Sequence, residues 1–199
     1  MKILGIDPGS AVIGWGVITI DDGITYSDFK SLRGSENDPL SNNMNGELAK
    51  HVTLKEYGCI NLEKIEKTEI RLMKLKEEID KIMRAHRPQS VVVERLFFGV
   101  NVKTAINVAQ ARGVLMLATA ENDIIYEEYT GLQVKKGIAG DGRADKKAIQ
   151  EAVRLFFALE ELPEVTDQLG KSIFRFRDDA ADAVACALFH FKKQHGLLE

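Results

Sequence analysis

The chain opens with Lys2-Ile-Leu-Gly-Ile-Asp7, continues through Pro8-Gly9-Ser10, and resumes as Val12-Ile-Gly-Trp-Gly-Val-Ile-Thr-Ile20. These two apolar runs, separated by proline, glycine and serine, predict two β-strands joined by a tight turn. The first strand ends on a carboxylate, Asp7, and the glycine that follows it lets a ligand come close to the backbone. The hairpin is therefore expected to begin a sheet and to present an acid at one end of it.

Apolar periodicity divides the rest of the chain into further strands and helices. The consecutive valines of 91–93 are typical of a strand buried in the middle of a sheet. The expected elements are strands at about 54–62, 90–94 and 124–129, helices at about 67–85, 102–120, 144–159 and 178–193, and a basic, glycine-rich loop at 135–143. Strands that come first, followed by alternating helices and strands, predict an α/β fold with a mixed sheet covered by helices.

A polar stretch from about Arg33 to His51 interrupts this pattern. It is rich in Ser, Asn, Gly, Asp and Glu, and it is longer than most loops between elements. We expect a polar insertion, which serves either as a tolerated surface excursion or as a dedicated binding element. The length of 199 residues otherwise predicts a single domain over 1–199.

The overall composition is that of a globular protein and gives no general sign of nucleic-acid binding. Hydrophobic residues make up 45% of the chain, charged residues 29%, and the formal net charge is -3, so any DNA-binding surface has to be local. No apolar run reaches the about 18 residues of a membrane span, and the N-terminus turns acidic before a signal peptide could form, which predicts a cytoplasmic protein. Cys59 and Cys186 are far apart in sequence and are expected to be buried, reduced thiols.

Two further segments place carboxylates at the ends of apolar elements. Glu94 ends the strand of three valines, and Asp178-Asp179-Ala-Ala-Asp182 begins the final helix. Asp179 and Asp182 are three residues apart, so they share a helical face with Cβ atoms about 5–6 Å apart, and the same geometry allows Asp178 to pair with Asp182. Taken singly, each acid has an ordinary structural explanation as a turn cap, an ion-pair partner or a helix cap.

Taken together, the acids predict a divalent metal site. Carboxylates gathered in a fold core repel one another and raise one another's pKa unless cations hold them. Hard oxygen ligands suit Mg²⁺ or Mn²⁺, and two ions about 3.5–4 Å apart activate a water and stabilise the leaving oxygen of a phosphodiester. The pattern therefore favours metal-dependent phosphodiester hydrolysis.

Several motifs, in one order along the chain, resemble those of the RuvC family of Holliday-junction resolvases. They are Ile3-Leu-Gly-Ile-Asp-Pro-Gly-Ser10, Gly14-Trp-Gly-Val17, Val93-Glu94 followed by Phe97, Ala109-Gln-Ala-Arg-Gly113, Gln133-Val-Lys135, Ala144-Asp-Lys146 and Asp179-Ala-Ala-Asp182-Ala. The resemblance covers almost the whole chain apart from the polar insertion, which departs from it, as does Arg177-Asp178. It implies a ribonuclease H-like fold, with a mixed five-stranded sheet flanked by helices, in a homodimeric endonuclease that nicks four-way DNA junctions symmetrically.

The resemblance also implies a role for individual residues. The catalytic ligands of two Mg²⁺ ions, for which Mn²⁺ substitutes, would be Asp7, Glu94, Asp179 and Asp182, because the register of the motif selects Asp179 over Asp178. Lys135 and Lys146 resemble basic residues near the scissile phosphate, and Phe97 resembles an aromatic residue that supports the opened junction centre. The helix around Ala109 to Gly113 is similar to the family's dimer helix, and branch-migration machinery is the further partner that the resemblance suggests.

A basic patch accompanies the acids in the sequence. The patch consists of Lys135, Lys136, Arg143, Lys146 and Lys147. Such a cluster neutralises phosphates locally even in an acidic chain, which favours DNA binding, although a charge run is more often a solvated face. Phe97 and Phe98 are ordinarily core residues, and only their position just past Glu94 favours stacking on bases.

Three other functions fit parts of this pattern. An actin-like or sugar-kinase ATPase also opens with a strand, an Asp and a Gly-Ser turn, but it encloses nucleotide between two domains, for which 199 residues are too few. A junction-binding protein that does not cut DNA is disfavoured because all four acids are present. A relative that acts on RNA or on flaps stays open, because phosphate contacts carry no sequence information. ATP binding, junction binding and Mg²⁺-dependent cleavage are the observations that separate these functions.

Overall fold

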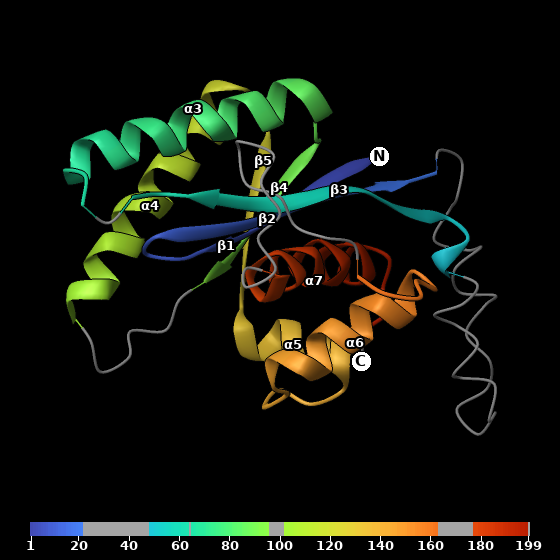
Figure 1. The fold of residues 1–199 in the computed structure, drawn as a ribbon. Helices are drawn as coiled ribbons and strands as arrows, with labels where there is room; N and C mark the ends of the chain where they lie inside the picture. The colour runs from blue at the N-terminus through green and yellow to red at the C-terminus, as the bar shows by residue number, and fades with distance from the viewer. Residues whose placement is uncertain (22–47, 64, 96–101, 163–176, 199) are drawn as a thin grey trace.

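A five-stranded sheet forms the centre of the molecule, with its strands in the order β3-β2-β1-β4-β5 (Figure 1). The computed structural model describes residues 1–21, 48–63, 65–95, 102–162 and 177–198. The opening segment forms the expected hairpin of β1 (Lys2–Pro8) and β2 (Val12–Ile20), and β3 (Val52–Asn61) pairs antiparallel with β2. β4 (Ser90–Arg95) and β5 (Ile125–Thr130) run parallel to β1. The mixed five-stranded sheet predicted from the sequence is confirmed.

Helices cover both faces of this sheet (Figure 1). α3 (Thr68–His86) and α4 (Val102–Glu121) lie on one face, where Leu75 and Leu115 pack against strand residues such as Val93. α5 (Gly131–Ala139), α6 (Lys146–Phe156) and α7 (Arg177–Gln194) lie on the other face. The molecule therefore has two cores, one on each side of the sheet.

Helix α7 lies against β1 and β2 with little side-chain volume between them. Its residues on this side are mostly alanines, and Ala180, Ala183, Ala185 and Ala187 have no exposed surface. Small side chains let a helix backbone approach a sheet closely. This close approach brings the first turn of α7 to the end of β1, which carries Asp7.

The basic, glycine-rich loop expected at 135–143 is only partly a loop. Lys135 and Lys136 lie inside α5, which begins with a capping box between Thr130 and Gln133. The helix ends where Gly140 adopts a left-handed φ of 80°, a conformation that favours glycine. The prediction was wrong here because the glycines suggested a loop, while the capping signal at Thr130 and Gln133 was overlooked.

Some of the predictions concern residues outside the described ranges, and others can be compared with the structure. Most of the polar insertion, residues 33–47, lies outside them, as do Phe97 and Phe98. At the end of the expected insertion, Leu48 is fully buried in the core on the α7 side of the sheet. Both cysteines are buried thiols, as the sequence predicted. Within the described ranges, none of the helices has the length and apolar composition needed to cross a membrane.

Candidate active site

Two acids are brought together by the parallel pairing of β1 and β4. Ile6 of β1 lies beside Val93 of β4, so Asp7 and Glu94 are the next residues along their strands. Parallel strands end at the same edge of a sheet, and alternate side chains point to the same face. Both carboxylates lie on the α7 face, where the charge of Glu94 raises the pKa of Asp7.

The other two acids come from the start of α7. Asp179 and Asp182 lie in its first two turns, and both carboxylates act electrostatically on Asp7. All four acids are partly buried rather than sealed in the core. The structure therefore brings together the four acids that the sequence predicted, at a site that solvent and substrate can reach.

The electrostatics of this cluster favour a bound cation. Burial raises the pKa of Asp7 well above its ordinary value, and the charges of Glu94, Asp182 and Asp179 raise it further. Burial also raises the pKa of Asp182 to about 6, and burial together with the charge of Asp182 raises the pKa of Glu94. Carboxylates that raise one another's pKa are stabilised most in their charged form when a cation lies between them.

Two lysines of the basic patch face the acids. The Lys146 ammonium lies 3.4 Å from Oδ1 of Asp179, and its charge lowers the pKa of Asp7, Glu94 and Asp182 against the effect of burial. Lys135, on α5, lowers the pKa of Glu94 and Asp182 in the same way. Both lysines therefore supply part of the positive charge that the acids need.

The rest of the basic patch lies further from the acids. Lys136, Arg143 and Lys147 are exposed, and none of them is among the groups that shift the pKa of the described acids. They lie on α5, on α6 and on the turn between these two helices. Their position suits contact with a long polyanion better than a part in chemistry at the acids.

The four carboxylates fit a divalent metal by their chemistry. They offer the hard oxygen ligands that Mg²⁺ and Mn²⁺ prefer, and burial together with repulsion from neighbouring acids raises the pKa of Asp7, Glu94 and Asp182. Among the residues that the structure describes, no three His, Cys, Asp or Glu side chains are arranged to hold an ion as they stand. Binding a metal here therefore requires the carboxylates to turn toward one another as the ion screens their charges.

Asp178 and Asp179 bind different partners. The Asp178 carboxylate accepts a hydrogen bond from Nε2 of Gln150 on α6, whereas Asp179 pairs with Lys146. The charge of Asp178 acts on Asp182 and Lys146, but it is absent from the charges that act on Asp7, where Asp179 is present. This arrangement supports the motif register, in which Asp179 belongs to the acid cluster and Asp178 holds α7 to α6.

A glycine that the sequence reading missed lies against one of the acids. A Cβ atom on Gly131, the first residue of α5, would lie 2.5 Å from Oε1 of Glu94. The start of α5 therefore limits where the Glu94 carboxylate can go. No feature of the local sequence shows this contact, because it joins residues from two different elements.

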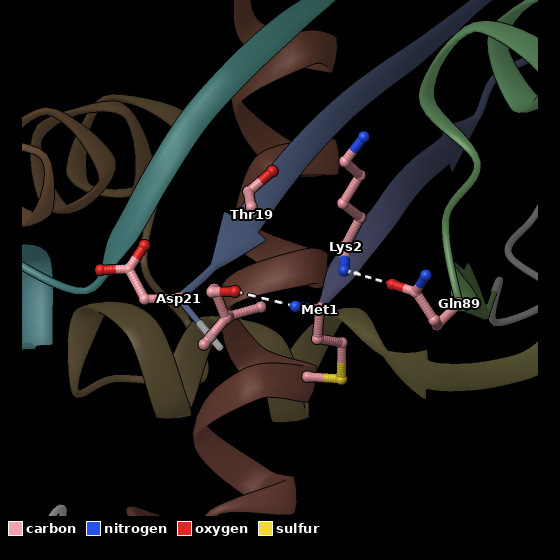
Figure 2. Close-up of a pocket in the computed structure, with 6 residues that line it drawn as sticks. Met1, Lys2, Thr19, Asp21 and Gln89 are labelled. Atoms are coloured by element: carbon pink, nitrogen blue, oxygen red, sulfur yellow. Dashed lines mark hydrogen bonds between the residues drawn. The ribbon is translucent and has the colours of Figure 1, made fainter. Parts of the chain in front are cut away.

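A polar hollow of about 510 Å³ lies away from these acids, where β1 begins and β2 ends (Figure 2). It is lined by Met1, Lys2, Thr19, Ile20, Asp21 and Gln89. The Met1 ammonium donates to the carbonyl of Ile20 at 2.8 Å, and the Lys2 amide donates to Oε1 of Gln89. Since Asp7 is at the opposite end of β1, this hollow is no part of the acid cluster.

Comparison with known proteins gives one consistent family. The sequence model described as Crossover junction endodeoxyribonuclease RuvC matches residues 34–190. A protein of that name from Fusobacterium nucleatum is 38% identical over 190 residues, covering 96% of this chain and 80% of its own length. Another, from Caldicellulosiruptor saccharolyticus, is 35% identical over 198 residues, covering 100% of this chain and 96% of its own length.

Solved structures agree with the sequence relatives. The structure of Thermus thermophilus RuvC has a TM-score of 0.71 and 24% identity, covering 100% of this chain and 99% of its own. The yeast mitochondrial Holliday junction resolvase has a TM-score of 0.58 and 11% identity, covering 98% and 80%. Likeness at these identities shows the ribonuclease H-like fold, and the sequence matches show the relationship itself. The chain belongs to the RuvC family of crossover junction endodeoxyribonucleases.

Proposed function

We propose that this protein resolves four-way DNA junctions by placing symmetric nicks through metal-assisted phosphodiester hydrolysis. The observation that carries this proposal is the convergence of Asp7, Glu94, Asp179 and Asp182 from β1, β4 and α7. The names of the relatives support it, as does a Thermus thermophilus RuvC structure in complex with a Holliday junction substrate, with a TM-score of 0.71.

We propose that these four carboxylates hold two Mg²⁺ ions, with Mn²⁺ as a substitute. A pair of divalent ions in such a site activates a water and stabilises the leaving oxygen of a phosphodiester. Burial raises the pKa of Asp182 to about 6. At neutral pH this carboxylate is therefore charged but poorly solvated, and a bound cation stabilises it. Two ions balance four carboxylates in charge.

The lysines of the site have separate tasks in this proposal. The Lys146 side chain is 56% exposed and lies beside Asp179, so it can turn to a phosphate oxygen and stabilise negative charge that develops there. Lys135 lies near Glu94 and Asp182 and adds positive charge at the same place. Lys136, Arg143 and Lys147 would hold the DNA backbone further out. Stacking by Phe97 stays a prediction.

A homodimer fits the surface of α4. Ile106 and Leu117, which are 54% and 55% exposed, lie on the same face of the helix as Gly113, where a Cβ atom would meet only open space. An apolar helical face with a small residue at its centre suits close packing against a second copy. Two copies related by a twofold axis would present two acid clusters to the two strands of a symmetric junction.

The dimer is tested by measuring molar mass in solution for Leu117→Glu. We expect the parent chain to be a dimer and Leu117→Glu to be a monomer, because a charge in an apolar interface is not compensated. Leu155→Glu is the matched control, since Leu155 is 60% exposed on α6, on the other side of the sheet. A dimeric Leu117→Glu variant would place the interface elsewhere.

The proposed activity is tested with end-labelled four-way, flap and linear DNA, each with and without Mg²⁺. We expect paired nicks in the four-way junction only when Mg²⁺ is present, and Asp7→Asn should bind the junction without cutting it. Junction binding by the parent chain without cleavage would indicate a protein that holds junctions, and preferential cutting of flaps or RNA would indicate another substrate. The branch-migration partner and the cytoplasmic location stay predictions from the sequence.

A further inference from the structure

A second charged cluster lies behind the acid cluster, on the opposite face of the sheet. Its centre is Glu128 of β5, whose side chain is only 11% exposed. Arg112 of α4 donates to both carboxylate oxygens, from Nε to Oε1 and from Nη2 to Oε2, the second at 2.7 Å. The Tyr126 hydroxyl donates to Oε1 at 2.7 Å, and Nε of Arg95 lies 3.5 Å from Oε2.

This cluster lies next to a proposed metal ligand in the chain. Arg95 directly follows Glu94 at the end of β4, and alternate residues of a strand point to opposite faces. Glu94 therefore faces α7 and the other acids, while Arg95 faces α4 and meets Glu128. The Glu128 carboxylate thus joins the last residue of β4 to a helix that packs on the back of the sheet.

The bonds around Glu128 are of the kind that fix geometry. A guanidinium that donates to both carboxylate oxygens holds the carboxylate coplanar with itself, and charge-assisted hydrogen bonds are stronger than neutral ones. Burial by itself would raise the pKa of Glu128, but the hydrogen bonds from Arg112 and Tyr126 outweigh it, so the pKa lies below its ordinary value. Glu128 is therefore charged at neutral pH, and both arginines remain paired.

We propose that Glu128 is a positioning residue for the nuclease site, because its carboxylate, held by Arg112 of α4, fixes Arg95 and with it the place of Glu94 among the metal-binding acids. This inference rests on the proposed function. On the α7 face, the start of α5 at Gly131 restricts the position of the Glu94 carboxylate. On the opposite face, Glu128 restrains the β4 backbone next to Glu94 through its contact with Arg95. A metal site loses affinity when a residue that orients one of its ligands is removed.

The test compares Glu128→Gln with Glu127→Gln. The first change keeps the shape of the side chain but removes the charge that holds two arginines. The second, the matched control, alters the neighbouring strand residue, which acts electrostatically on His190 on the α7 side. Mn²⁺ affinity is measured without DNA by electron paramagnetic resonance, and junction cleavage is measured over a range of Mg²⁺ concentrations.

We expect Glu128→Gln to lower Mn²⁺ affinity about tenfold and to raise the Mg²⁺ concentration for half-maximal cleavage by a similar factor. Excess Mg²⁺ should restore most of the cleavage rate, and the affinity for junction DNA should stay within about twofold, because the phosphate contacts are untouched. Glu127→Gln should resemble the parent chain in all three measurements.

Arg95→Gln keeps the test decisive if Glu128→Gln fails to fold. Arg95 is 54% exposed, so its replacement leaves the Arg112–Glu128 pair and the core in place while removing the link to β4. It should lower Mn²⁺ affinity in the same direction. A lower melting temperature with unchanged Mn²⁺ and Mg²⁺ dependence would make Glu128 a purely structural residue and overturn the inference. A parent chain that binds Mn²⁺ but does not cut junctions would instead contradict the proposed function, while the Mn²⁺ comparison would still test Glu128.

Discussion

The backbone carbonyl oxygen of Asp179 occupies the space that a Cβ atom on Gly14 would need. Gly14 lies opposite Asp7 in the antiparallel pairing of β1 with β2. The absent side chain at Gly14 therefore lets the first turn of α7 rest on the sheet directly beside Asp7. This backbone contact brings Asp179 close to Asp7, although the two acids are more than 170 residues apart in the sequence.

Replacing Gly14 by alanine should harm both folding and chemistry. The added methyl group meets backbone atoms that cannot rotate away, so we expect a loss of about 1–3 kcal/mol in the free energy of unfolding. It should also push Asp179 outward and slow junction cleavage at least about tenfold, since small misplacements of reacting groups are costly. Urea unfolding and single-turnover cleavage measure the two effects. Gly58→Ala, whose methyl would meet the Trp15 ring at 3.1 Å, should be milder, and equal effects would contradict this account.

Asp178 and Asp179 should respond differently to the same change. We expect Asp179→Asn to remove Mg²⁺-dependent cleavage without lowering the melting temperature, because it takes a charge out of a repelling group. Asp178→Asn should stay largely active, since an amide oxygen still accepts the hydrogen bond from Gln150. Cleavage rates and melting curves of the two variants provide the comparison. Reversed activities would mean that the metal-binding register is shifted by one residue.

The acid cluster should destabilise the metal-free protein at neutral pH. Burial raises the folded-state pKa of Asp182 to about 6, whereas an unfolded aspartate has a pKa of about 3.9. The folded state therefore binds this proton more tightly than the unfolded state does. The stabilisation of the fold by the bound proton is fully present below about pH 4 and is lost as the pH rises through about 6. Asp182→Asn should raise the metal-free free energy of unfolding at pH 7.5 by at least about 1 kcal/mol.

Melting curves from pH 4 to pH 8, with EDTA or with Mg²⁺, test this linkage. We expect Mg²⁺ to raise the melting temperature of the parent chain more at pH 8 than at pH 5, because only charged carboxylates bind it. The response of Asp182→Asn should be smaller and flatter with pH. A parent chain whose metal-free stability does not change across this range would show that these acids titrate normally.

Lys146 and Lys147 provide a matched pair within the basic patch. Lys146 lies 3.4 Å from Asp179, while Lys147 is exposed and has no contact with the described acids. We expect Lys146→Ala to slow single-turnover cleavage about a hundredfold at saturating protein, because a charge near the scissile phosphate is lost. Lys147→Ala should mainly weaken binding and reduce its salt dependence. Loss of binding with an unchanged rate in Lys146→Ala would make Lys146 a contact to the DNA backbone.

The acid cluster could be predicted because its members lie at the ends of strongly patterned elements. Asp7 and Glu94 each end an apolar strand, and helical spacing relates Asp182 to either Asp178 or Asp179. Local patterns therefore locate the group of acids, and the resemblance to the RuvC motifs selects Asp179. The position of Lys135 in a helix was missed because glycines were weighed above the capping pair of Thr130 and Gln133. At this segment the local composition predicted a loop, whereas the capping pair indicated the start of a helix, and the structure has the helix.

The supporting contacts could not be predicted in this way. Gly131 against Glu94, and Glu128 between Arg95 and Arg112, join residues from separate elements whose approach depends on the packing of the whole fold. A sequence pattern describes which face a residue takes, but not which distant residue it will meet there. Long-range pairs of this kind have to be read from the structure.

The place of α7 in the chain has a consequence for the timing of activity. The helix supplies Asp179 and Asp182, and it is made long after Asp7 and Glu94. A chain growing on the ribosome therefore carries two of the four proposed metal ligands without the other two, and contacts between distant segments form late in folding. If all four acids are needed, DNA cutting can begin only after translation has passed α7 and the helix has docked, and we expect unfinished chains to bind DNA without cutting it.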